Sequence, residues 1–190
     1  SNSGPAFLVG SIGAGVFGSA RLGVGLYIIH VLAAAITGLF FRVDGKCRGN
    51  APAAPRESGG ALIESVRQAA QSILSVCGFI VCFCVIIGLL DAHGMFSLLA
   101  GQLAQITGLE LHAARAALSG FLELGSGIGA MRGLAVSPAA GIVGWGGVSV
   151  HFQTYAVLAD SDIKGGLHLA GRLINCAVSA TLGYIFGLLL

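Results

Sequence analysis

The chain has 190 residues and a net charge of +2; 55% of its residues are hydrophobic, only 9% are charged, and its mean hydropathy is +0.89. Soluble domains carry about 25% charged residues, so this composition excludes a soluble globular fold and predicts an all-α, multi-pass membrane protein. The 31 glycines favour closely packed or interrupted membrane helices, and no basic tract with interleaved aromatic residues predicts a nucleic-acid partner.

The chain begins with a predicted half-helix followed by a membrane span. Residues 1–20 are apolar but start with the polar Ser3-Gly4 pair, and they are too short for a full span of about 20 apolar residues. They suit a half-helix or re-entrant segment, with an ordinary helix whose glycines face a neighbour as the alternative. Residues 22–41 predict a full span in which His30 is the only ionisable residue.

The next segment, 42–60, is a polar loop that contains prolines, glycines and an excess of basic residues. Its basic residues are Arg42, Lys46, Arg48 and Arg56. Because cytoplasmic loops of membrane proteins are enriched in Lys and Arg, the sequence predicts that this loop lies in the cytoplasm.

Residues 61–90 predict one long helix, amphipathic in its first half and apolar in its second. Four polar residues at i, i+4, i+7 and i+11 share one face of it: Glu64, Gln68, Gln71 and Ser75. This stripe indicates either a helix foot at the membrane interface or a cavity lined by Gln68 and Gln71. Residues 91–110 are of mixed polarity without Lys or Arg, and we expect them at the opposite surface.

The last part of the chain carries two predicted breaks. Residues 111–124 start a helix that reaches Glu123 and then four glycines within 125–133, where a continuous helix is disfavoured. A second apolar run is interrupted at WGGVSVHFQTY, residues 145–155, before a final span at 167–190. Helix-breaking glycines at membrane depth are tolerated only where protein or a cavity satisfies the backbone, so this interruption predicts a site.

The two ends of the chain resemble each other. When they are superposed in sequence, Ser3-Gly4 falls on Gly146-Gly147, and each pair is followed by a half-helix, a short polar turn and a long span. Such an internal repeat is typical of secondary transporters with paired broken helices. The predicted units are a first repeat unit, a cytoplasmic loop, a long helix with a surface segment, and a second repeat unit: 1–41, 42–60, 61–110 and 111–190.

Several motifs resemble a known family. NSGPAFLVGSIGAGVFGS, SVRQAAQSILSVCGFIVCF, FLELGSGI and GGVSVHFQTYAVL together resemble the sporulation integral membrane proteins of the YlbJ type, which belong with the nucleoside-recognition or Gate domain membrane proteins. The resemblance implies a polytopic inner-membrane protein of bacteria with transporter-like repeats and, for the sporulation members, a part in moving dipicolinic acid. It covers what corresponds to the C-terminal half of the family's longer members.

The candidate solute-binding residues lie at the breaks and on the polar stripe. They are Ser3, Gly4, Gln68, Gln71, Ser126, Gly127, Gly147, Ser149, His151 and Gln153. Two half-helices that begin at breaks would direct unpaired N–H groups at one region, which favours an anion. As the alternative, Ser3 and Ser149 would simply cap their helices. Phe152 and Tyr155 are suited either to stacking on a solute ring or to packing.

Glu123 is the candidate for a coupling ion, because a carboxylate beside a backbone break can bind a proton or a sodium ion. As the alternative, Glu123 is the fixed partner of Arg115, Arg132 or Arg172. Arg172, near the start of its helix, is also suited to reach the membrane interface. His30 suits a satisfied interior histidine better than a proton relay.

The favoured function is a transporter, or half of one, that moves a small anionic or polar aromatic solute, dipicolinate-like or nucleoside-like, across the bacterial inner membrane. The rival is a non-transporting scaffold that packs with a partner through glycine-rich faces. No catalytic motif predicts an enzyme. We expect no cofactor beyond a coupling proton or sodium ion, and as partners the bilayer, the solute, and either a second copy or a second chain that supplies an N-terminal half.

Overall fold

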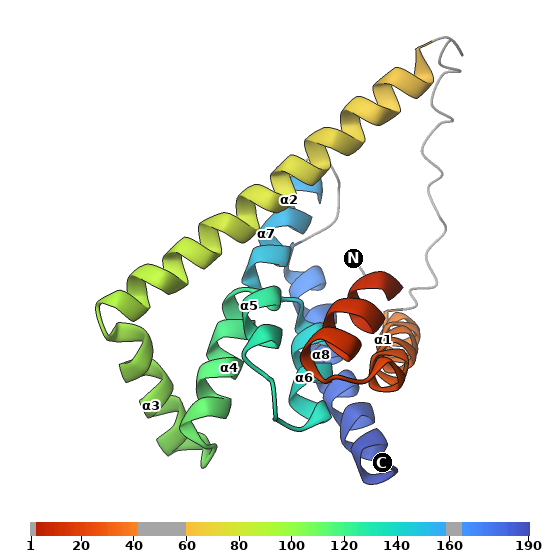
Figure 1. The fold of residues 1–190 in the computed structure, drawn as a ribbon. Coiled ribbons are helices and arrows are strands. Elements are labelled where there is room, and N and C mark those ends of the chain that lie inside the picture. The colour runs from red at the N-terminus through yellow and green to blue at the C-terminus, as the bar shows by residue number, and fades with distance from the viewer. Residues whose placement is uncertain (1–2, 42–59, 159–164) are drawn as a thin grey trace.

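The computed structural model describes residues 3–41, 60–158 and 165–190, and every element in these ranges is a helix (Figure 1). The elements, in chain order, are η1 (Ala6–Val16), α1 (Ala20–Phe40), α2 (Ala61–Ala92), α3 (Met95–Thr107), α4 (Leu111–Leu122), α5 (Leu124–Gly129), α6 (Val136–Trp145), α7 (Gly147–Leu158) and α8 (Gly165–Leu188). The predicted all-α class is therefore confirmed, while the predicted cytoplasmic loop lies almost wholly outside the described residues.

Three helices, α1, α2 and α8, are long and apolar enough to cross a membrane. Their positions confirm the helices predicted at 22–41, 61–90 and 167–190. None of the residues of α2 is buried, and side chains such as Leu62 and Val81 are 75% and 61% exposed. Figure 1 shows α2 running obliquely past the other helices rather than through them. So much apolar surface indicates a membrane or partner around this helix.

The predicted half-helix is present as η1, a wide π-type helix of 11 residues that doubles back along α1. A Cβ placed on Gly13 would lie 2.4 Å from the Cα atom of Gly23 in α1, so the two helices touch backbone to backbone. The alternative prediction, a helix whose glycines face a neighbour, therefore also holds. The backbone N–H of Ser3 donates to Nε2 of His30, which places the start of η1 beside the middle of α1.

The predicted break near Glu123 is confirmed, and it turns the chain back on itself. Glu123 is extended, with φ −139° and ψ 123°, between α4 and the six-residue α5. A Cβ on Gly127 would collide with the backbone of Gly120, so α5 lies against α4 as a tight hairpin whose tip is Glu123-Leu124. Only glycine at position 127 permits this approach, while a Cβ on Gly120 would meet the Ile142 side chain of α6.

The predicted break within 145–155 is also confirmed, at Gly146 and Gly147, whose φ angles are +90° and +80°. Below the break, α6 lies along α8, and Gly144 sits against Ser179 and the backbone of Asn175. Above the break, α7 continues to the start of α8, where the Tyr155 hydroxyl donates to the Gly165 carbonyl.

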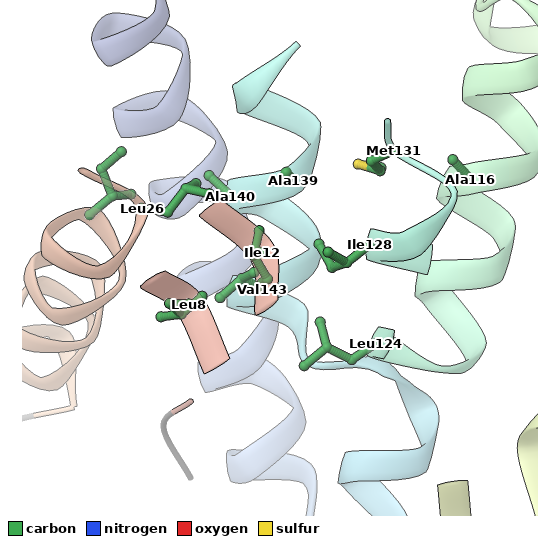
Figure 2. Packing of buried hydrophobic residues seen from close by; sticks show 11 residues of the cluster. Leu8, Ile12, Leu26, Ala116, Leu124, Ile128, Met131, Ala139, Ala140 and Val143 are labelled. Atoms are coloured by element: carbon green, nitrogen blue, oxygen red, sulfur yellow. The ribbon is translucent and has the colours of Figure 1, made fainter. Parts of the chain in front are cut away.

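The hydrophobic core lies on one side of the breaks (Figure 2). It joins η1, α1, α4, α5 and α6, together with the chain that follows α5, and contains Leu8, Ile12, Leu26, Ile29, Ala116, Leu124, Ile128, Met131, Ala139, Ala140 and Val143. Because several of these are alanines, the helices approach closely and leave no wide gap there. The polar residues described next lie where this packing ends.

Candidate functional site

Two interruptions of the helical backbone and the segment that leads into η1 meet at one cavity. Its volume is about 180 Å³, and Ser3, Leu124 and Gly146 each contribute from a different one of these segments. The remaining lining residues are Val143, Val150, Gln153 and Arg172. The structure thus brings together two of the predicted solute-binding residues, Ser3 and Gln153. We call this space the Arg172 cavity.

The hairpin tip and the α7 break are in direct contact. A Cβ on Gly147 would lie 2.9 Å from the backbone nitrogen of Leu124 and 3.3 Å from the Cα atom of Glu123. Since Gly147 also has a positive φ, both the backbone conformation and the space around it require glycine. This contact fixes one wall of the Arg172 cavity.

Arg172 and Asn175 satisfy a backbone carbonyl that the α7 break releases. Gly144 is in the last turn of α6, where carbonyl groups lack intrahelical partners. The Arg172 guanidinium donates to the Gly144 oxygen at 3.3 Å, and Nδ2 of Asn175 donates to the same oxygen at 2.9 Å. The hydroxyl of Thr37 in α1 donates to Oδ1 of Asn175 at 3.4 Å. Two side chains of α8 thus hold the break open.

Arg172 is only 7% exposed. The prediction that it reaches the membrane interface is therefore wrong, because α6, α7 and α8 enclose its head group. The sequence around Arg172 does not indicate that its head group is buried, since its hydrogen-bond partner Gly144 lies 28 residues away. Asn175 was not singled out from sequence either, and only its contact with Gly144 identifies it.

His30 accepts the Ser3 N–H through Nε2 at 3.1 Å, so the ring is neutral and its proton is on Nδ1. His30 is therefore an interior histidine, as expected, but only one of its two ring nitrogens is satisfied. The Nδ1 atom is buried and has no hydrogen-bond partner among the described residues.

Gln153 lies between the Arg172 cavity and a second, larger hollow. This second hollow, the α2/α7 groove, has a volume of about 590 Å³ and contains Gln153 together with Gln68, Gln71, Ser72, Ser75, Val76 and Ala156. The polar stripe predicted on α2 therefore does face a hollow, as the cavity-lining interpretation expected for Gln68 and Gln71. Phe152 of α7 packs on Phe79 and Phe83 of α2, with ring centroids 6.2 and 5.8 Å apart, and holds the two helices together beside the groove.

Glu123 caps α5. Its two carboxylate oxygens accept the backbone N–H groups of Gly125 at 2.9 Å and Ser126 at 2.6 Å, and the residue is 3% exposed. Two of the arginines predicted as partners of Glu123 bind elsewhere. Arg115 forms an ion pair with Asp91 at 2.7 Å, and Arg132 donates to the backbone carbonyl of Gly15.

No ion pair between described residues includes Glu123. The predicted pairing of Glu123 with an arginine is therefore wrong. The short helix α5 supplies two backbone N–H donors to the Glu123 carboxylate, and these hydrogen bonds take the place of an ion pair with an arginine.

The remaining predicted site residues do not line the Arg172 cavity. Ser149 is 0% exposed and is the third residue of α7, so it does not cap the helix; its hydroxyl has no hydrogen-bond partner among the described residues. Gly127 packs on α4, Gly4 is exposed, and the Ser126 hydroxyl lies 3.5 Å from the Cys84 sulfur of α2.

His151 belongs to a cluster of aromatic rings beside the Gly146-Gly147 break. Its ring lies 4.3 Å from that of Trp145, and its Nδ1 is 3.2 Å from Nε2 of His168. Trp145 stacks on Phe121 of α4 and donates to the Phe121 carbonyl at 3.0 Å. The Tyr155 ring packs edge-on against His168. Since Phe152 packs on α2, both of these aromatic residues serve in packing.

Comparison with known proteins gives no match: no protein-family model, curated protein or solved structure matches the chain. The resemblance to the sporulation membrane proteins stays a prediction from the sequence motifs.

Proposed function

We propose that the chain is a multi-pass helical membrane transporter, or half of one, that binds a small anionic or polar solute in the Arg172 cavity. The observation that carries the proposal is the meeting of two backbone breaks and the start of η1 around a buried guanidinium. In a bilayer, irregular backbone is stable only where protein or an aqueous cavity satisfies it. Here Glu123, Arg172 and Asn175 provide those partners.

The arrangement of the elements supports a membrane placement. We place α1, α2, α8 and the broken α6–α7 pair across the bilayer, with η1 and the α4–α5 hairpin entering only halfway. Secondary transporters bind solutes at such half-helix ends near the midplane. The repeat of 1–41 and 111–190 belongs to this proposal, as does a bacterial inner membrane with loop 42–60 in the cytoplasm.

The lining of the Arg172 cavity favours an anionic group. A guanidinium keeps its charge when buried and offers up to five N–H donors in a planar fork that fits a carboxylate. The N-terminus of α7 at Gly146-Gly147 adds a positive dipole end on the same side. At about 180 Å³ the cavity is below the roughly 300–1,000 Å³ of sites that enclose drug-sized ligands, so it suits a small group. A solute that carries a carboxylate fits this chemistry better than a neutral nucleoside-like one.

The test is the thermal stability of the purified chain in detergent with a panel of small anions and nucleosides, dipicolinate included, with and without sodium. A ligand that binds the native state raises its stability by mass action. We expect a saturable rise with at least one carboxylate, reduced in Gln153→Ala and retained in the control Gln102→Ala, an exposed glutamine of α3. A sodium-dependent rise that is lost in Glu123→Gln would support the coupling role of Glu123. No shift with any compound, from folded protein, would refute the proposal.

A scaffold that holds a partner is the second candidate, and the exposure of α2 favours it. The small residues that this function would need, Gly13, Gly23, Gly120 and Gly127, are already used in contacts within the chain. On α2, by contrast, nothing lies within 4 Å of a Cβ placed on Gly78 or Gly88. Cross-linking between chains through α2, together with unchanged Tm across the solute panel, would favour the scaffold.

A further inference from the structure

The Arg172 cavity and the α2/α7 groove have different chemistry and share one side chain, Gln153. We propose that they are two subsites for one solute: a monoanion whose carboxylate binds at Arg172 and whose neutral, hydrogen-bonding body lies in the groove. This inference rests on the proposed transport function and specifies the class of solute.

The inner subsite accommodates one negative charge. Among the described residues that line the cavity, Arg172 is the only ionisable one, and Leu124, Val143 and Val150 are apolar. A second carboxylate held here would lose its hydration without gaining a cation, and such burial is costly. The small volume also limits this subsite to one such group.

The outer subsite offers hydrogen bonds without charge. The described residues of its lining include three glutamines and two serines, and none of these described residues is charged. Gln68 is occupied, because its amide donates to Glu64 at 3.0 Å, and the Ser72 hydroxyl donates to the Gln68 carbonyl. The side chains of Gln71 and Gln153 have no hydrogen bond among the described residues. Each amide provides two donors and one acceptor oxygen, which suits amide or hydroxyl groups.

Gln153 joins the two subsites. Val150 and Gln153 lie three residues apart on one face of α7 and, together with Gly146 of the break, line the Arg172 cavity, while Gln153 is also part of the groove. A solute with its carboxylate at Arg172 therefore extends past Gln153 toward Gln71. The 590 Å³ of the groove is within the usual range for a small-molecule site.

The experiment compares three probes of nearly equal size that differ in charge: succinate, succinamate and succinamide. Dissociation constants are measured on the full chain in detergent, from Trp145 fluorescence and from shifts in Tm. We expect the monoanion succinamate to bind most tightly. We also expect Gln71→Ala to weaken succinamate about five-fold, because one hydrogen bond contributes about 1 kcal/mol. The bare carboxylate of propionate should be unaffected by Gln71→Ala, and Gln102→Ala should change neither affinity.

The outcomes separate this inference from the transport proposal. Equal or tighter binding of succinate, or an unchanged affinity for succinamate in Gln71→Ala, would overturn the two-subsite inference while leaving an anion site at Arg172. Tighter binding of the neutral succinamide would overturn the assignment of a negative charge to the inner subsite. If none of the four compounds binds to folded protein, the inference is refuted, and the transport proposal is then decided by its own panel of anions and nucleosides.

Discussion

Substitution of Gly147 by alanine tests the contact between the two breaks. The change has two costs, because Gly147 has φ +80° and because its Cβ would lie 2.9 Å from the backbone nitrogen of Leu124. A left-handed conformation costs a non-glycine residue about 1–2 kcal/mol, and overpacking against fixed backbone costs about 1–3 kcal/mol more. We therefore expect Gly147→Ala to destabilise the chain by roughly 2–5 kcal/mol.

The matched control is Gly133→Ala. Gly133 has nearly the same φ, +81°, but nothing lies within 4 Å of a Cβ built on it, so only the conformational cost remains. The assay is thermal unfolding of both variants in the same detergent. At roughly 2–4 °C per kcal/mol for a chain of this size, Gly147→Ala should unfold several degrees below Gly133→Ala. Equal Tm values would show that the hairpin tip does not pack on the α7 break.

Three further predictions address the residues around the site. Glu123→Ala should lower stability by about 1–2 kcal/mol in thermal unfolding, because two N–H groups of α5 lose their cap, whereas Glu110→Ala should be nearly neutral, since Glu110 precedes α4 without a capping bond. Ser149→Ala should leave Tm unchanged or raise it, because it removes a buried hydroxyl without a partner; a fall of more than about 1 kcal/mol would mean that this hydroxyl is bonded. In a chain whose native cysteines are replaced, a cysteine at Gln71 should react with a water-soluble maleimide, and one at Val143 should not; the reverse order would contradict the placement of the groove and the core.

Both breaks could be predicted from sequence because their signals are local. Glycine clusters lower helix propensity wherever they occur, so the interruptions after Leu122 and at Gly146 follow from a few neighbouring residues. Long apolar runs likewise fix where α1, α2 and α8 lie. The repeat pattern and the family resemblance are also sequence signals, and they stay predictions.

Only part of the composition of the site could be predicted, because the rest depends on contacts between residues far apart in the chain. Ser149 and Gln153 look equivalent in sequence, yet Ser149 is fully buried and Gln153 faces two hollows. A shift of four residues along α7 is enough for this difference, since neighbours along the helix meet different elements. The charge of Glu123 suggested an arginine partner, but the short helix α5, which follows Glu123 in the chain, supplies two backbone N–H donors instead.

The partners of the broken backbone explain why polar residues gather at this depth. A break in α6–α7 exposes the Gly144 carbonyl, and an apolar neighbour there would leave it unsatisfied at a cost of about 1–3 kcal/mol. Arg172 and Asn175 remove that cost, but they require space for a guanidinium and an amide between α1, α6 and α8. The Arg172 cavity is thus the consequence of satisfying the break. Under the proposed function, a solute carboxylate in this cavity would meet a charge whose position the fold has already fixed.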